Sequence, residues 1–302
     1  MEKSLKEEEV SMGNDKLTKM EKYWILYDVG NSAFTLLVST IIPIYFNALA
    51  GNAGISEVDY LAYWGYAASI STVIVAILGP TMGTVADTRN YKKPLFVFFM
   101  MIGVIGCAAL SVPTSWIVFL VVFVIAKVGY NASLIFYDSM LVDVTTPERM
   151  DKVSSHGYAW GYIGSCIPFI ISLVFVLMYE SIGITMNTAM MLAFLINAVW
   201  WVLMTLPLLK NYRQKNFAAP PEHPIKDSFI RLGHTLRDIK KEKKIFLYLL
   251  AFFFFIDGVY TIIEMATAYG SALGLDTTGL LLALLVTQIV AFPCALIFSR
   301  FS

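Results

Sequence analysis

The chain has 302 residues with 22 basic and 22 acidic side chains, so its formal net charge at pH 7 is zero and no basic domain indicates a nucleic-acid partner. Hydrophobic residues make up 58% of the composition and charged residues only 15%, with a mean hydropathy of +0.68. Soluble domains are about 45–50% apolar and about 25% charged, so this composition excludes an ordinary soluble domain and predicts apolar side chains that face lipid.

Apolar runs of bilayer length predict the spanning elements. Eight such runs follow one another along the chain, at roughly 23–48, 60–82, 95–112, 115–137, 155–178, 188–209, 245–270 and 279–299. They are longer than barrel strands and do not alternate, and only helices of this kind satisfy their backbone within lipid. We therefore expect an all-α polytopic membrane protein.

The basic residues lie on one side of these spans. All lysines and arginines except Lys127 fall in the tail 1–22, in the connections after the second, fourth and sixth spans, or after the last span. Because basic loops stay in the cytoplasm, the tail 1–22 and the long connection 210–244 are predicted to be cytoplasmic.

The connection 210–244 contains apolar residues at helical spacing among basic ones. They are Ile225, Phe229, Leu232, Leu236 and Ile239. The pattern predicts an amphipathic helix that lies on the inner leaflet or against the helix bundle. We expect it to link a six-helix half, 23–209, to a partial second half, 245–302, which contains two helices.

Polar residues at helical spacing interrupt three of the apolar runs. Such groups have to face away from lipid, and ionisable ones commonly mark a solute or ion pathway. Hydrogen bonds between helices are the alternative interpretation for the serines and threonines. One water-filled cavity between the three spans accommodates them all. The candidate pathway residues are Asp28, Asn31, Ser32, Thr35, Lys127, Tyr130, Asn131, Asp257, Thr261 and Glu264.

Lys127 lies near the middle of the fourth span. A lysine at that depth costs about 2.5–3.5 kcal/mol or more without a partner or water. We expect it to pair with Asp28 in one conformation, or to compete with Asp28 through the solute. Asp28, Asp257 and Glu264 are the candidate proton carriers.

Two further motifs lie at the cytoplasmic side. The stretch "GTVADTRNYKKP", 83–94, combines a glycine and a carboxylate with basic residues. It predicts either a plain cytoplasmic anchor or a conformational latch. The candidate latch residues are Gly83, Asp87, Arg89, Lys92, Lys93, Asp143, Glu148 and Arg149. In the fifth span, Gly157, Gly161 and Gly164 share one face and predict close helix packing.

The sequence predicts no metal site and no cofactor. Cys107, Cys166 and Cys294 all fall in apolar runs without metal-ligand spacing, so we expect buried structural thiols. His156 is expected to be structural. We find no Ser/His or Cys/His arrangement and no phosphate-binding glycine loop that would indicate an enzyme.

Several blocks carry a resemblance to a known family. The stretch "GTVADTRNYKK" resembles the loop signature of the major facilitator superfamily, although Thr88 replaces its usual basic residue and the final basic pair lies one place later. The stretch "YDVGNSAF", 27–34, is similar to the opening of the vacuolar effluxer branch linked to autophagy, which has bacterial relatives. Residues 130–144, 152–165 and 257–270 are similar to later blocks of that branch.

The resemblance implies a secondary transporter of small polar solutes that works by alternating access in a bacterial plasma membrane, with protons as coupling ion. Yeast members are associated with amino-acid efflux, so an amino-acid-like solute is expected. Lys127 departs from the family pattern, in which an uncharged polar residue is expected at this position. Because a central lysine suits a carboxylate, an organic anion is the second expected solute class. Since superfamily members have twelve helices, we also expect these 302 residues to be a truncated product. The alternative function is a non-transporting membrane scaffold. Oligomeric state is left open.

Overall fold

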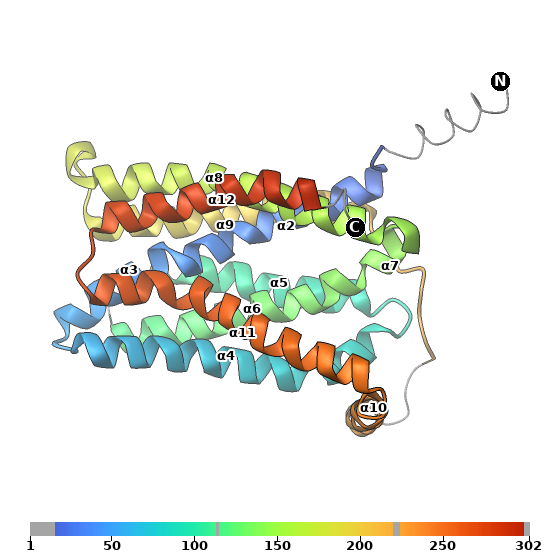
Figure 1. Cartoon of the computed structure of the whole chain (residues 1–302). Helices are drawn as coiled ribbons and strands as arrows, with labels where there is room; N and C mark the ends of the chain where they lie inside the picture. The colour runs from blue at the N-terminus through green and yellow to red at the C-terminus, as the bar shows by residue number, and fades with distance from the viewer. Residues whose placement is uncertain (1–15, 113–114, 220–223, 299–302) are drawn as a thin grey trace.

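A computed structural model describes residues 16–112, 115–219 and 224–298 (Figure 1). Within these ranges, eight segments are helical, long and apolar enough to cross a membrane. The predicted all-α fold with eight spans is therefore confirmed. Lys3, Lys6, Arg300 and the connection 113–114 lie outside the described residues, as do the side chains of Ile225, Arg231 and Leu236.

The long spanning helices run along the length of the molecule, whereas the helix labelled α10 is seen end-on (Figure 1). The spans are formed by α2 (Lys19–Ser39) with α3 (Ile41–Asn52), α4 (Glu57–Ala86), α5 (Lys92–Ala109), α6 (Trp116–Ser139), α8 (Met150–Ile182), α9 (Met186–Asn211), α11 (Lys243–Ala272) and α12 (Thr277–Phe298). The short α7 (Leu141–Val144) and a 3-10 turn, Pro147–Arg149, connect α6 to α8, and α10 (Pro224–Ile239) lies in the long connection. We call the end near α7 and α10 the basic end.

The first predicted span, 23–48, is one apolar run but two helices. The backbone breaks at Thr40, whose φ of −131° and ψ of −85° are not helical. Pro43 has no N–H to donate to the Ser39 carbonyl four residues earlier, which weakens the helix at this point. The freed carbonyl of Ser39 instead accepts a hydrogen bond from the Thr267 hydroxyl of α11. The break thus provides an acceptor for a helix that comes much later in the chain.

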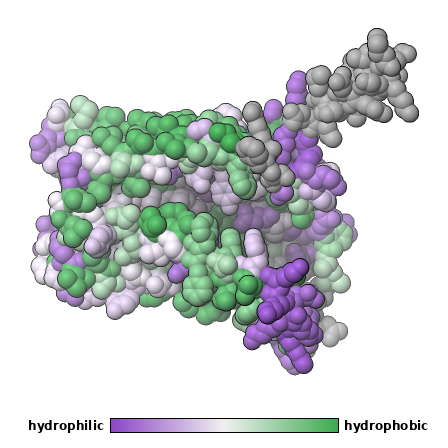
Figure 2. All heavy atoms as spheres, in the orientation of Figure 1, coloured by the Kyte–Doolittle hydropathy of each residue, from purple (hydrophilic) through white to green (hydrophobic). Residues whose placement is uncertain are grey.

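The first six spans form the core of the bundle. The largest fully buried side chains belong to these spans and include Trp64, Trp201, Tyr27 and Tyr60. Of the last two spans, α11 packs along α3 and α4, and α12 packs along α8. Figure 2 shows hydrophobic surface along the length of α8 and α12 and hydrophilic residues over α10. This pattern is that of a membrane protein with one polar end at α10.

The glycines of α8 allow α2 to approach closely. A Cβ atom on Gly164 would lie 2.5 Å from Val29 Cγ1, and one on Gly161 would lie 2.7 Å from Ser32 Oγ. A Cβ on Gly157 would lie 3.1 Å from Asp28 Oδ2. The "YDVGNSAF" stretch of α2 therefore packs on the three glycines, whose missing side chains leave room for its carboxylate and hydroxyl.

The helix α10 has two distinct faces. Ser228 is buried and its hydroxyl lies 2.6 Å from Thr84 Oγ1 of α4. Phe229 and Leu232 remain 45% and 39% exposed. The helix therefore rests on α4 through a polar contact, while part of its apolar face stays free.

The prediction of three buried thiols is wrong for one cysteine. Cys107 and Cys166 are buried, but Cys294 is exposed. Cys294 belongs to α12, which has a long packing contact with α8 and little contact with α11. An apolar run does not by itself bury a side chain when the helix has few neighbours.

The glycine packing leads to a stability prediction. We expect Gly164→Ala to lower the free energy of unfolding by about 1–3 kcal/mol, because the added methyl overlaps Val29 in a packed interface. Gly258→Ala in α11 is the matched control, since a Cβ there meets nothing within 4 Å. Unfolding in mixed micelles measures both variants, and equal stabilities would contradict the packing role of Gly164.

Candidate functional site

A cavity of about 840 Å³ lies between α2, α4, α6 and α11. This volume falls in the range of about 300–1,000 Å³ that is usual for small-molecule sites. Its polar and ionisable lining residues are Thr35, Ser69, Thr72, Lys127, Tyr130, Asn131, Asp257, Tyr260, Thr261 and Glu264. Four spans therefore direct polar side chains into one space, three of which were indicated by the helical spacing of their polar residues.

An ion pair joins two helices across this cavity. Lys127 Nζ of α6 lies 2.7 Å from Glu264 Oε1 of α11, with side-chain exposures of 4% and 25%. At this distance the two opposite charges are in direct contact. The ammonium also lies 5.9 Å from the centre of the Phe123 ring, which stacks on Trp64 at 4.5 Å.

The partner of Lys127 differs from the one expected from sequence. Asp28 lies 3.3 Å from Asn31 Nδ2, which donates a hydrogen bond to it, and packs against the α8 glycines instead. The sequence identifies both side chains as intramembrane charges, but it does not specify which face of α2 meets α6. In this structure Lys127 is paired with Glu264.

Seven of the ten predicted pathway residues line the cavity and three do not. Thr35 Oγ1 and the Tyr130 hydroxyl lie there, 2.6 Å apart, and connect α2 to α6. Asp28, Asn31 and Ser32 lie outside the lining and pack among α2 and α8. The polar stripe of α2 thus serves two purposes along its length: it packs α8 near the basic end and faces the cavity at Thr35.

The sequence analysis missed the contribution of α4. Gly65, Ser69 and Thr72 line the cavity at positions i, i+4 and i+7. The polar residues predicted in α2, α6 and α11 have the same helical spacing. The pattern in α4 was therefore present in the sequence, but it consists only of small, uncharged residues. Trp64 was missed as well; its indole Nε1 donates to the main-chain carbonyl of Glu264 at 2.9 Å.

Contacts between α11 and the first spans gather at the end opposite the basic end. Asn47 Nδ2 of α3 donates to Ser271 Oγ at 2.8 Å. The Thr267 hydroxyl donates to the Ser39 carbonyl, and Trp64 donates to that of Glu264. These three bonds hold α11 against α2, α3 and α4 on that side of the cavity.

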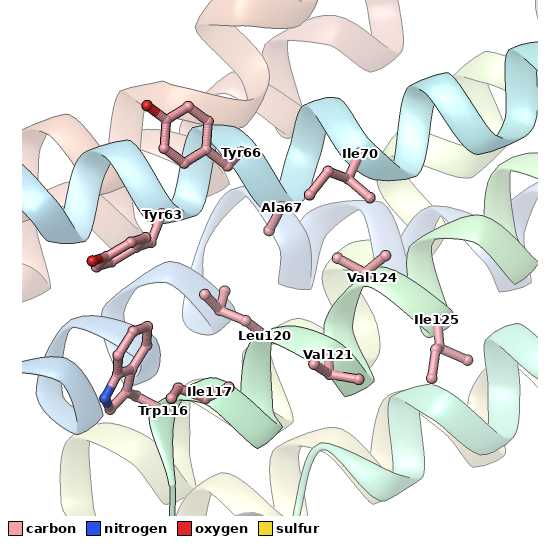
Figure 3. A pocket seen from close by; sticks show the side chains of 10 residues that line it. All are labelled: Tyr63, Tyr66, Ala67, Ile70, Trp116, Ile117, Leu120, Val121, Val124 and Ile125. Carbon is pink, nitrogen blue, oxygen red and sulfur yellow. The ribbon is translucent and has the colours of Figure 1, made fainter.

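A second cavity, of about 460 Å³, lies on the outer side of α4 and α6. Figure 3 shows its lining of aromatic and aliphatic side chains, among them Tyr63, Trp116 and Leu120. It contains no charged group, so it does not suit a polar solute, and its lining is that of a surface in contact with acyl chains.

Two polar networks hold the basic end together. The first is centred on Asp143, whose side chain is fully buried and lies 3.4 Å from Lys92 Nζ. Its carboxylate accepts hydrogen bonds from the Tyr212 hydroxyl at 2.5 Å and from the main-chain N–H groups of Lys215 and Asn216. Burial raises the pKa of the Tyr212 phenol well above its usual range, and the Asp143 carboxylate acts in the same direction, so the phenol remains a donor.

The second network is centred on Glu21 at the start of α2. Glu21 and Thr18 form a capping box, in which each residue satisfies a backbone N–H of the other. The same carboxylate lies 2.8 Å from Arg149 Nη2 and accepts a hydrogen bond from Thr145 at 2.6 Å. The first turn of α2 is therefore fixed to the connection between α7 and α8.

The remaining predicted latch residues contribute less. Asp87 uses its main-chain carbonyl, which accepts from Ala218 N at 2.8 Å, and its side chain is exposed. The guanidinium of Arg89 lies 5.3 Å from the centre of the Phe217 ring. A Cβ on Gly83 would meet nothing within 4 Å. Lys93 and Glu148 lie at the same end and belong to neither of these two networks.

Known proteins with a similar sequence identify the family of this chain. The family described as "Vacuole effluxer Atg22 like" matches residues 18–302. The chain belongs to this Atg22-like family. It is 42% identical over 290 residues to "Uncharacterized MFS-type transporter YxiO" of Bacillus subtilis (strain 168), an overlap of 94% of this chain and 68% of that protein. It is 22% identical over 295 residues to "Autophagy-related protein 22" of Coccidioides immitis (strain RS), an overlap of 74% and 47%.

Membership of the Atg22-like family confirms the resemblance noted in the sequence. The chain is an integral, multi-pass membrane protein with a helix bundle of the major facilitator type. The names of the family and of the Bacillus relative are those of transporters and not of enzymes.

The ion pair leads to a coupling prediction. Glu264→Gln leaves the buried Lys127 ammonium without its partner, and Lys127→Gln leaves the partly exposed Glu264 carboxylate without its own, so the double variant should lose less stability than the sum of the two single losses. We expect a coupling of about 0.5–3 kcal/mol in a double-mutant cycle of unfolding free energies. The control cycle of Lys127→Gln with Asp28→Asn should be additive. Coupling to Asp28 but not to Glu264 would contradict the pairing.

The Asp143 network leads to a second prediction. Asp143→Ala leaves the Lys92 ammonium, 3% exposed, without its counter-charge, and we expect a loss of about 3–5 kcal/mol in unfolding free energy. Glu148→Ala removes an exposed carboxylate of the same end and should change the stability by less than about 0.5 kcal/mol. Similar losses in the two variants would show that burial of the Lys92–Asp143 pair is unimportant.

Proposed function

We propose that this protein is a secondary transporter that carries a small polar solute across the membrane through the cavity between α2, α4, α6 and α11. The observation that carries the proposal is the buried Lys127–Glu264 pair inside a cavity of about 840 Å³. Charges within a membrane are costly and usually serve a pathway. The names of the family and of the Bacillus relative support the same function.

Alternating access is part of the proposal. The hydrogen bonds of α11 to α2, α3 and α4 close one side of the cavity. At the other side Asp257 of α11 is exposed. We propose that the basic end is cytoplasmic, following the placement of the lysines and arginines, so that this conformation is open to the cytoplasm.

The proposed organisation has two moving parts. Residues 23–209 form the first half, 210–244 the linker and 245–302 the described part of the second half. The contacts of α11 and α12 with the first half involve few polar side chains, which suits a contact that forms and breaks. Protons are the proposed coupling ion, with Glu264 and Asp257 as the acidic groups of the cavity. The proposed location is a bacterial plasma membrane.

A variant that fills the cavity tests the proposal. Gly65 lines the cavity and a Cβ there would meet nothing within 4 Å, so Gly65→Leu should fold while occupying the space of the solute. We expect at least about a tenfold loss of solute flux in proteoliposomes under a pH gradient. Gly258→Leu is the matched control, because it adds the same side chain at an open helical position outside the lining.

The flux assay screens amino acids, sugars and organic acids with the wild-type chain. Flux that depends on the gradient, survives Gly258→Leu and is lost in Gly65→Leu supports transport through this cavity. Absence of flux for every solute class would contradict the proposal and favour a non-transporting scaffold. Equal flux in the two glycine variants would place the pathway elsewhere.

A further inference from the structure

The ionisable groups of the central cavity are unequally distributed. Those in its lining are Lys127, Tyr130, Asp257, Tyr260 and Glu264, and all lie on α6 or α11. The lining residues of α2 and α4, as far as the structure describes them, are not ionisable. Lys127 is therefore the single cation of the lining, and Glu264 occupies it in this conformation.

We propose that Lys127 is the binding group for the carboxylate of a small organic anion, and that Glu264 leaves Lys127 by taking up a proton when the anion binds. This inference rests on the proposed function, because it assigns a substrate class to the same cavity. Asp257 belongs to the same face of α11, but it lies seven residues, or roughly 10 Å along the axis, from Glu264. It is thus too far away to replace Glu264 at the ammonium.

Charge balance explains why a proton has to accompany the anion. The Lys127–Glu264 pair is neutral, and an anion that entered alone would add a negative charge to a buried, weakly solvated site. A proton that enters from the bulk solution binds the Glu264 carboxylate, the Nζ–Oε1 contact breaks, and the solute carboxylate takes its place at Nζ. Lys127 stays protonated throughout, so one anion and one proton enter together and the net charge of the site is unchanged.

The two partners differ in their freedom to move. The Lys127 side chain is 4% exposed and lies over Phe123, which stacks on the buried Trp64. The Glu264 side chain is 25% exposed to the cavity. Its main-chain carbonyl is held separately by the Trp64 indole at 2.9 Å. The carboxylate can therefore swing into the cavity while the ammonium and the α11 backbone stay in place.

Calorimetry on the purified full chain in detergent tests this assignment. The probes are acetate, propionate and benzoate, and their uncharged amides acetamide, propionamide and benzamide serve as matched controls. Titration in two buffers of different ionisation enthalpy counts the protons bound. We expect the carboxylates to bind, the amides not to bind, and about one proton to be taken up per anion at about pH 7.

The pH dependence and two variants separate the roles of the pair. Because one proton binds with each anion, the wild-type Kd should rise about tenfold per pH unit in the alkaline range. Glu264→Gln should bind the carboxylates without proton uptake and without this dependence. Lys127→Gln should bind them at least about tenfold more weakly. Glu180→Gln changes an exposed glutamate outside the cavity and should behave as the wild type.

The wild-type proton count needs no variant, so the test stands even if a substitution prevents folding. Equal binding of amides and carboxylates, or carboxylate binding without proton uptake by the wild type, would overturn the inference. Flux of a polar solute in proteoliposomes without carboxylate binding would overturn it as well and leave the proposed function standing. Proton-linked carboxylate binding without any flux would support the assignment and contradict transport.

Discussion

An ammonium group in the middle of a membrane-spanning helix has to find a counter-charge or water, and Lys127 imposes this condition on the whole bundle. Its partner, Glu264, comes from a helix that follows all six spans of the first half. This pair joins α6 to α11 across a cavity instead of a filled apolar core. The charge contact adds to the hydrogen bonds that hold α11 against α2, α3 and α4.

The break in the first span has a similar consequence for the backbone. A regular helix uses its own carbonyls and offers none to a neighbour, whereas Pro43 leaves the Ser39 carbonyl without its intrahelical donor. Thr267 satisfies that carbonyl. The proline thus frees the one acceptor through which Thr267 holds α11. The hydroxyl of Tyr60 in α4 donates to a carbonyl inside α3, that of Pro43, at 2.8 Å.

Sequence patterns predicted the spans well, because bilayer length and hydropathy are local properties. They also identified Lys127, Asn131, Thr261 and Glu264, since polar residues at helical spacing are visible within one helix. The pairing of Lys127 was not predictable, because it depends on how α2 and α11 rotate about their axes against α6. The contribution of α4 was missed since Gly65, Ser69 and Thr72 carry no charge. The hydrogen bond of Lys215 to Asp143 uses a main-chain N–H group, which leaves no mark in the sequence.

The two ends of the bundle are fixed by different kinds of interaction. At the basic end, ion pairs join segments of the first six spans to one another, and hydrogen bonds to Asp143 join them to the residues that follow α9. At the opposite end, α11 is held through main-chain carbonyls of Ser39 and Glu264 and by one amide contact, none of which depends on a charged side chain. Among the described residues of α11, the charge contact with the first half is that of Glu264 with Lys127. Because the backbone of α11 is anchored independently, this ion pair can open without displacing the helix. A binding site needs this property if a solute is to take the place of one of the site's side chains.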